Sequence, residues 1–172
     1  LRVDVNAMSN ADDLARAVAE GGLDNEFSLR VRSGDLSLDR DVKARRIAMA
    51  ADDGRLSIGM AKLDASSSGG GLVQLMAGRE LVLAQGAQID ARSERDGANG
   101  GDVLLASVRG RVSLAAGATI DASGDDDQDG RIVLRAPRGS NTVGIDPLNL
   151  AGLRAAEIDI EAVRVYSTVT VG

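Results

Sequence analysis

The sequence predicts an all-β fold, namely a parallel β-helix (a β-solenoid) of about six coils with a short N-terminal helix. Three short aliphatic phrases recur in a fixed order, and the spacing between repeats grows mostly at one place. Repetition with a period of about 20 to 50 residues is typical of solenoids and propellers. The composition agrees, because Phe27 and Tyr166 are the only aromatic residues among 172, and narrow stacked coils need small aliphatic side chains.

Residues 1–33 are predicted to form an irregular N-terminal region that leads into the first coil. Within it, residues from about 11 to 20 are predicted to form a short helix. Asn10 can cap its N-terminus, acidic residues follow in the first turn, and a pair of glycines ends it. Leu14 and Val18 share one helical face, which we expect to lie on the solenoid.

Residues 34–136 are predicted to form the repeat coils of the β-helix. The recurring phrases are Gly-x-h-x-h, h-x-Ala and h-x-h-x-Ala, where h is aliphatic. Alternation of aliphatic and other residues indicates a short strand with one buried face. Superposing the phrases predicts four inward stacks, which are Leu36, Leu56, Leu81 and Val112; Leu38, Ile58, Leu83 and Leu114; Val42, Leu63, Ile89 and Ile120; and Ile47, Val73, Val103 and Ile132, continued by Ile158.

The repeats differ in length mostly at one corner. The h-x-Ala phrase begins at Val42, Leu63, Ile89 and Ile120, which gives repeats of 21, 26 and 31 residues. The added residues follow this phrase and are rich in Gly, Ser, Asp and Asn, as loops are. They occupy 66–71, 92–101 and 123–130. A constant core unit with variable loops on one edge supports the solenoid prediction.

Residues 137–172 are predicted to form degenerate C-terminal coils. Pro137 and Gly139 interrupt the rhythm, and two weaker strands follow at Glu157–Ile160 and Val163–Tyr166. The alternative fold is a doubly wound α/β domain. That fold needs helical patterns of about 10 to 15 residues between its strands, and the sequence lacks them.

The composition also limits the chemistry. The chain has no His and no Cys, which excludes a Ser-His-Asp triad, a thiol nucleophile, an imidazole or thiolate zinc site and a disulfide. The net charge of −6 argues against a nucleic-acid partner, and no apolar stretch is long enough to insert in a membrane. We expect no cofactor and no enzymatic activity. Because the chain begins Leu1-Arg2-Val3 without a signal peptide, we expect an interior segment of a longer protein.

An acidic loop is a candidate calcium site. Asp125, Asp127 and Asp129 precede Gly130 in a D-x-D-x-D-G pattern, which resembles the start of a calcium-binding loop. The twelfth position is Ala136, however, where a bidentate glutamate is needed. The alternative is a solvated acidic loop tip, and we predict no metal beyond this weak candidate.

Asp64, Asp90 and Asp121 occupy equivalent positions in three consecutive coils. Outward-pointing carboxylates there form a ladder that can bind a cation or another ligand. The alternative is structural, in which each carboxylate accepts hydrogen bonds from backbone N–H groups at the strand end. Lys43 holds the same place one coil earlier and is expected to pair with Asp64.

Ser37, Ser57 and Ser113 also align on an outward face, and Val82 interrupts the row. A hydroxyl row can bind ice or a sugar. The interruption favours an ordinary polar surface.

Three segments of the repeats stand out, which are Gly-Gly-Asp-Val-Leu-Leu-Ala (100–106), Leu-Ala-Ala-Gly-Ala-Thr-Ile-Asp-Ala-Ser-Gly (114–124) and Gly-Arg-Ile-Val-Leu-Arg-Ala-Pro-Arg (130–138). They resemble the passenger repeats of filamentous haemagglutinin-type exoproteins, and the likeness covers roughly residues 27–166. These proteins are large adhesins that Gram-negative bacteria export by two-partner secretion. The resemblance implies a right-handed parallel β-helix, a secreted or cell-surface location and an outer-membrane secretion partner. The asparagine motif of that family's N-terminal secretion domain is missing, and no catalytic residues carry over.

The predicted function is therefore a structural or interaction segment, part of the β-helical shaft of an adhesin-like virulence protein. Its host or neighbouring-cell receptor or glycan is unknown. One alternative is a carbohydrate-active β-helix enzyme of the lyase or glycosidase type. Such enzymes stack sugars on aromatic side chains, of which this chain has two. The other alternative is the stalk of a contact-dependent toxin-delivery protein.

Overall fold

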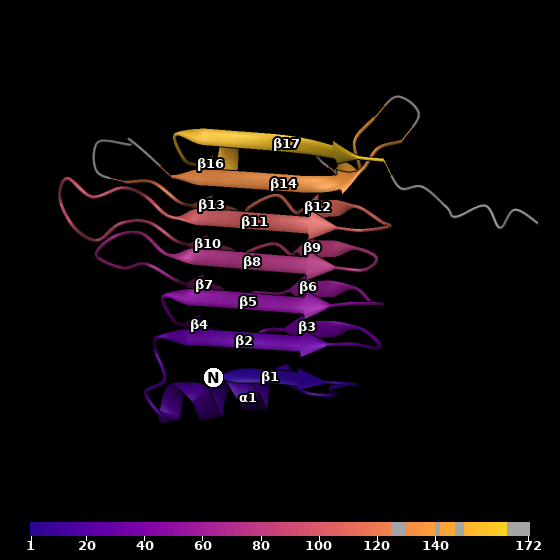
Figure 1. The fold of residues 1–172 in the computed structure, drawn as a ribbon, viewed down its shortest axis with the longest axis horizontal. Coiled ribbons are helices and arrows are strands. Elements are labelled where there is room, and N and C mark those ends of the chain that lie inside the picture. The colour runs from indigo at the N-terminus through magenta and orange to yellow at the C-terminus, as the bar shows by residue number, and fades with distance from the viewer. Residues whose placement is uncertain (125–129, 140–141, 147–149, 165–172) are drawn as a thin grey trace, which may run out of the picture.

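Three parallel β-sheets make up most of the fold (Figure 1). The structure is a computed structural model that describes residues 1–124, 130–139, 142–146 and 150–164. From β2 onward the chain visits the three sheets in turn, and each of the five circuits from β2 to β16 adds one strand to each sheet, while β1 and β17 add to the first sheet alone. The fold is therefore all-β with parallel sheets, and among the described residues α1 (Ala11–Glu20) is the single α-helix.

The first sheet has seven strands and the other two have five each. The first sheet contains, in spatial order, β1 (Arg2–Val5), β2 (Glu26–Val31), β5 (Arg46–Ala51), β8 (Leu72–Ala77), β11 (Asp102–Ser107), β14 (Arg131–Pro137) and β17 (Glu157–Val163). The second contains β3 (Leu36–Leu38), β6 (Leu56–Ile58), β9 (Leu81–Leu83), β12 (Val112–Leu114) and β15 (Ile145–Asp146). The third contains β4 (Val42–Lys43), β7 (Lys62–Asp64), β10 (Gln88–Asp90), β13 (Thr119–Asp121) and β16 (Leu153–Arg154), which follows the 3-10 turn η2 (Leu150–Gly152).

The register confirms the stacks predicted from the repeats. In the second sheet Leu36 lies beside Leu56, which lies beside Leu81, and that residue lies beside Val112. The third sheet aligns the stack that begins at Val42, and the first sheet aligns the stack from Ile47 to Ile158. Period-2 alternation identified these positions because only one face of each strand is buried.

The core lies between the three sheets. Its residues are aliphatic apart from Phe27 on β2, and most of them, Phe27 included, are completely buried. Burial of one such Leu, Ile or Val side chain contributes about 1.5–3 kcal/mol relative to exposure. Glycines at a corner let the backbones of successive repeats approach closely. A Cβ at Gly101 would lie 2.1 Å from the carbonyl oxygen of Ala91 and 2.3 Å from that of Gly71.

Helix α1 covers the core at its N-terminal end (Figure 1). The Asn10 side chain accepts hydrogen bonds from the backbone N–H groups of Asp12 and Asp13 at 3.1 and 3.2 Å, as the sequence predicts. Val18 is buried together with two alanines of the same face, and this face contacts β3 and β4. Leu14 is only partly buried against the core.

Three details differ from the sequence prediction. Strand β1 pairs in parallel with β2 within the region predicted as irregular. Strand β14 continues through Pro137, which is its last residue. Strand β17 runs from Glu157 without a break to Val163, past the end of the first of the two weaker strands predicted there. Residues 165–172, which include part of the second of these, lie outside the described chain. Pairing with a neighbouring strand decides these bounds, since local propensity is weak there.

Candidate functional site

The three aspartates predicted to align do so in the third sheet. Asp64 lies beside Asp90, and Asp90 lies beside Asp121. Each carboxylate Oδ1 accepts a hydrogen bond from the backbone N–H two residues later, at 3.1 Å from Ser66, 3.4 Å from Arg92 and 3.1 Å from Ser123. The carboxylates therefore close the turns that follow β7, β10 and β13, which is the structural alternative stated above.

Lys62 neutralises two of these carboxylates. Its Nζ atom lies 3.0 Å from Asp64 Oδ2 and 3.0 Å from Asp90 Oδ2. The prediction that Lys43 pairs with Asp64 is wrong in its partner, because Lys62, on the same strand as Asp64, forms this salt bridge. Lys43 lies beside Asp64 in the register, but its side chain is exposed.

Hydrogen bonds hold Lys62 and Asp64 in their charged forms. Burial lowers the pKa of Lys62, but the hydrogen bonds and charges of Asp64 and Asp90 outweigh burial, so that its pKa is raised. Burial raises the pKa of Asp64, and the Ser66 hydroxyl at 2.6 Å, Lys62 and a backbone N–H outweigh it, so that its pKa is lowered. A general acid needs a raised pKa. Asp64 is therefore held as a carboxylate, which suits a structural role.

The candidate calcium ligands Asp125, Asp127 and Asp129 lie outside the described residues. Within the described part of the chain, no group of three or more Asp, Glu, His or Cys side chains could hold a metal ion. The backbone on either side of the loop belongs to the stack, since Ser93 N–H donates to the Ser123 carbonyl at 3.0 Å and Arg131 N–H donates to that of Gly101 at 2.9 Å.

The corner loops are more regular than their composition indicates. Ser67 and Ser93 form a parallel bridge between the loop after β7 and the loop after β10. Glu94 N–H donates to the Ser67 carbonyl at 2.9 Å, and the Ser66 hydroxyl donates to the Glu94 carboxylate at 2.9 Å. These loops therefore continue the stacking of the sheets outward. A polar hollow of about 510 Å³ lies between glycines 69–71 and 100–101 on one side and Arg45 and Arg46 on the other.

The serine row has the predicted register and the predicted interruption. Ser37 lies beside Ser57, and Val82 separates Ser57 from Ser113. The Ser113 hydroxyl donates to the Glu80 carboxylate at 3.2 Å. The serine row therefore does not present a regular array of hydroxyl groups, because Val82 interrupts it and the Ser113 hydroxyl is hydrogen-bonded to Glu80.

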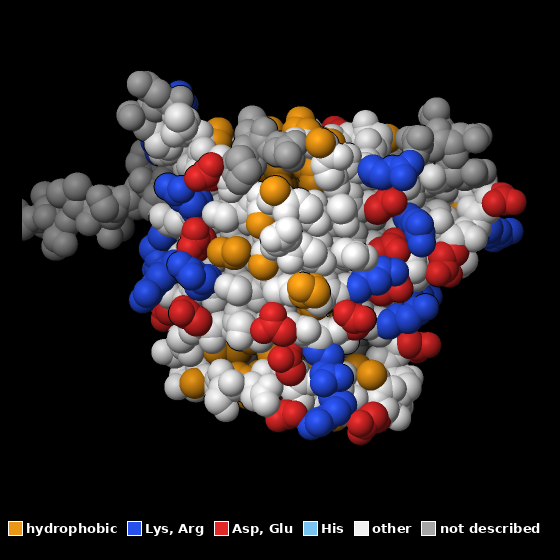
Figure 2. All heavy atoms as spheres, turned by 180° about the vertical axis from the view of Figure 1, so that it is seen from behind, with side chains coloured by type: hydrophobic (Ala, Val, Ile, Leu, Met, Phe, Trp, Pro, Cys, Tyr) orange, Lys and Arg blue, Asp and Glu red, His pale blue; other side chains and the backbone are white. Residues whose placement is uncertain are grey.

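Charges of opposite sign alternate along several outer columns, a signal that reading single motifs missed. The column that precedes the second sheet contains Asp35, Arg55, Glu80 and Arg111. Within it, Arg55 N–H donates to Asp35 at 2.8 Å, and its guanidinium lies 2.7 Å from Glu80. Figure 2 shows Lys and Arg side chains mixed with Asp and Glu in two stripes, with a band of few charges between them. Charge alternation lets each repeat neutralise the next.

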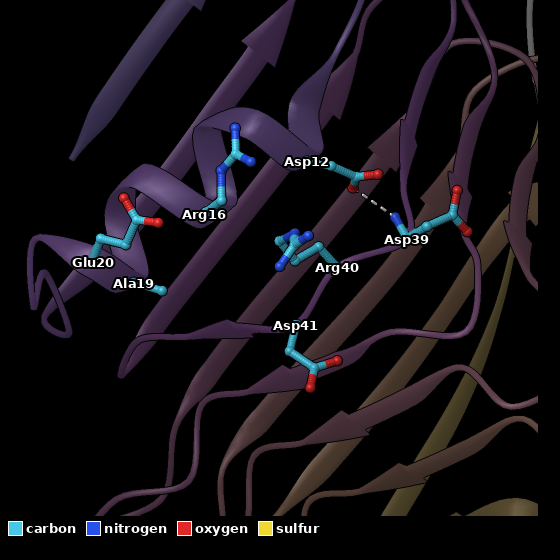
Figure 3. A pocket seen from close by; sticks show the side chains of 7 residues that line it. All are labelled: Asp12, Arg16, Ala19, Glu20, Asp39, Arg40 and Asp41. Carbon is cyan, nitrogen blue, oxygen red and sulfur yellow. Dashed lines mark hydrogen bonds between the residues drawn. The ribbon is translucent and has the colours of Figure 1, made fainter.

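A second hollow, of about 650 Å³, lies between α1 and the turn from β3 to β4 (Figure 3). Asp12 Oδ1 accepts a hydrogen bond from Asp39 N–H at 2.9 Å, and Asp41 Oδ1 accepts one from Lys62 N–H at 2.8 Å. The Arg40 side chain lies in the space between the helix and Asp41. The first contact fastens the helix to the turn after β3, and the second joins that turn to β7 of the next repeat.

Within the described residues, no helix combines the length and apolar character needed to cross a bilayer. Comparison with protein families, with curated proteins and with solved structures finds no match for this chain.

Proposed function

We propose that this chain is a segment of a right-handed parallel β-helix that serves as a shaft. The observation that carries the proposal is the pairing of each strand from β2 to β14 with its counterpart one repeat later, in all three sheets. A stack of this kind buries a continuous aliphatic core and grows by adding repeats, as solenoids do. Seven strands of the first sheet, at about 4.8 Å each, span roughly 30 Å along the stack.

The proposed setting is an adhesin-like exoprotein that is secreted or displayed on the bacterial surface. The likeness of 100–106, 114–124 and 130–138 to passenger repeats of haemagglutinin-type exoproteins supports it. The clusters described above support a mechanical role, because their carboxylates close turns and bridge repeats. Such a shaft holds a distal module away from the cell, and its parent needs an outer-membrane secretion partner.

Immunoelectron microscopy tests the setting. Antibodies against residues 1–172 are applied to intact and to permeabilised cells of the source organism. The proposal expects label on intact cells. Label that appears only after permeabilisation would overturn it.

A second assay tests the role as a shaft without chemistry. The chain and its natural parent are incubated with acidic polysaccharides, and new reducing ends and unsaturated products are measured. The shaft proposal expects neither product. Cleavage that is lost on mutation of residues within this chain would replace it with the carbohydrate-active alternative.

A further inference from the structure

The aliphatic core does not determine which repeat stacks on which. Strands β5, β8 and β11 all have six residues, and β3, β6 and β9 all have three. The buried positions of β3, β6 and β9 are nearly identical, with Leu36, Leu56 and Leu81 in one column and Leu38, Ile58 and Leu83 in the other. A repeat therefore buries its core almost equally well against its chain neighbour or against the repeat beyond it.

The length of the connecting chain discriminates only weakly between these two arrangements. From Leu36 the chain reaches Leu56 after 20 residues and Leu81 after 45 residues. The probability that a flexible loop closes falls with about the three-halves power of its length, so the longer connection closes only about threefold less often. Stacks that skip one repeat are therefore close competitors of the observed register while the fold grows.

A column of charged residues beside the second sheet does distinguish the two arrangements. Asp35, Arg55, Glu80 and Arg111 each precede a strand of this sheet, and we call them the sign column. Backbone N–H groups of the strands donate to the carbonyls of Arg55, Glu80 and Arg111 at 2.8 to 2.9 Å, which places each member beside the next. Arg55 N–H donates to Asp35 at 2.8 Å, and its guanidinium lies 2.7 Å from Glu80. Neighbouring members therefore have opposite charges, and members two repeats apart have the same charge.

The third sheet shows that alternation is not general on this surface. Asp64, Asp90 and Asp121 lie side by side with the same charge, and Lys62 bridges two of them at 3.0 Å. In that column a skipped repeat exchanges one aspartate neighbour for another. The charges of the third sheet therefore do not discriminate between the observed register and a skipped repeat, whereas those of the sign column do.

We propose that the sign column specifies the register during folding, because it favours stacking of each repeat on its chain neighbour and disfavours a stack that skips a repeat. Skipping the repeat of β6 would place Asp35 beside Glu80, and skipping that of β9 would place Arg55 beside Arg111. Like charges directly opposite each other on adjacent strands are destabilising. This inference rests on the register of the second sheet and does not depend on the proposed role as a shaft.

Cysteine pairs can report a skipped repeat, because the chain has no cysteine of its own. The outward positions Ser37, Ser57, Val82 and Ser113 follow one another across the second sheet. Ser37→Cys with Val82→Cys is one reporter pair, and Ser57→Cys with Ser113→Cys is the other. Each pair lies two strands apart, about 9.6 Å, which is too far for a disulfide in the observed register. Skipping β6 makes the first pair adjacent, and skipping β9 makes the second pair adjacent.

Two charge reversals have opposite expected effects on these reporters. Glu80→Arg attracts Asp35 and repels Arg55, so we expect only the disulfide between positions 37 and 82 to increase, at least about fivefold. Arg55→Glu attracts Arg111 and repels Glu80, so we expect only the disulfide between positions 57 and 113 to increase, by a similar factor. Each chain is unfolded in urea with reductant and refolded by dilution into a glutathione redox buffer, and mass spectrometry measures the linked fraction. Both increases are expected to shrink at about 1 M salt, which screens exposed charges.

Two further variants control for the loss of a favourable contact. Glu80→Gln removes the charge without reversing it and is expected to raise the 37–82 disulfide less than Glu80→Arg does. Reversal of all four members (Asp35→Arg, Arg55→Glu, Glu80→Arg and Arg111→Glu) restores alternation and is expected to leave both disulfides at their original level.

Several outcomes would overturn the proposal. An increase of both disulfides in each single reversal would assign the effect to a general loss of stability. No increase in either, or increases that persist undiminished at high salt, would show that charge does not select the register. A native-register pair, Ser37→Cys with Ser57→Cys, monitors correct stacking in every variant. Single reversals that form neither this disulfide nor their skipped one would also contradict the proposal, because they would misfold without changing register.

Discussion

The glycines just before β8 and β11 leave no room for a side chain, because backbone atoms of neighbouring repeats lie against them. A Cβ at Gly101 would lie within 2.3 Å of two backbone oxygens, whereas a Cβ at Gly69 in the adjacent loop would meet nothing within 4 Å. We expect Gly101→Ala to destabilise the fold by about 1–3 kcal/mol or more, since backbone must shift to admit the methyl group. Gly69→Ala, the matched control, is expected to change stability by less than about 1 kcal/mol. Urea unfolding measures both, and equal effects would contradict the close approach.

Lys62 stabilises the third sheet through its two salt bridges. Replacing it by Met leaves Asp64 and the nearly buried Asp90 without their shared cation. We expect a loss of about 1–3 kcal/mol in the free energy of unfolding. Lys43→Met is the control, because this exposed lysine is expected to change stability by no more than about 0.5 kcal/mol. A larger effect at Lys43 than at Lys62 would restore the pairing expected from the sequence.

The same cluster predicts a pH dependence. The pKa of Asp64 is lowered on folding, so its stabilising contribution is present above about pH 4, the unfolded value, and is lost as the pH falls through the folded pKa. The pKa of Lys62 is raised, so its contribution is present below about pH 10.4 and is lost as the pH rises through the folded pKa. Urea unfolding is measured from pH 2 to pH 11. We expect the free energy of unfolding of Lys62→Met to fall less at both pH extremes than that of the unsubstituted chain. Identical profiles would refute this assignment.

At the scale of elements, α1 protects the first repeat from solvent. Val18, on the face of α1 that contacts the core, is buried, whereas Ala17 on the same helix is exposed. Val18→Asp places a carboxylate among aliphatic side chains, and we expect a loss of about 2–4 kcal/mol together with stronger binding of a hydrophobic dye. Ala17→Asp adds the same group on the outer face and is expected to have little effect. Dye binding that rises equally in both variants would mean that the helix is not a cover.

The alternation of aliphatic residues and the helix-capping residue predicted those elements that depend only on residues close together in the sequence. The column from Leu36 to Val112 and the cap at Asn10 follow from alternation and from side-chain chemistry within a few residues. Strand β1 and the partner of Asp64 could not be predicted in this way. Strand β1 exists through pairing with a strand more than 20 residues later, and Lys62 reaches Asp90 across the sheet. The candidate calcium residues lie outside the described chain, so their prediction stays a prediction.

At the scale of the whole molecule, neighbours differ between the middle and the ends of the stack. Among the described strands, β8 has a paired strand on each side, whereas β17 has one. In a linear array of repeats, terminal units open more easily than central ones. We therefore expect hydrogen exchange to be slowest in β5, β8 and β11 and fastest in β17. Uniform protection along the chain would mean that the repeats open as one unit.

The corner loops vary in length without changing the register of the strands on either side of them. Residues 66–70 and 92–100 are inserted between equivalent positions, whereas the repeat before them passes from Ala44 to Arg45 without any insertion. The strands on either side keep the same register in all three cases. Foreign peptides grafted between Ser68 and Gly69, both exposed, would therefore be displayed beside the adjacent loop at a spacing of about 4.8 Å, set by the sheets and not by the graft.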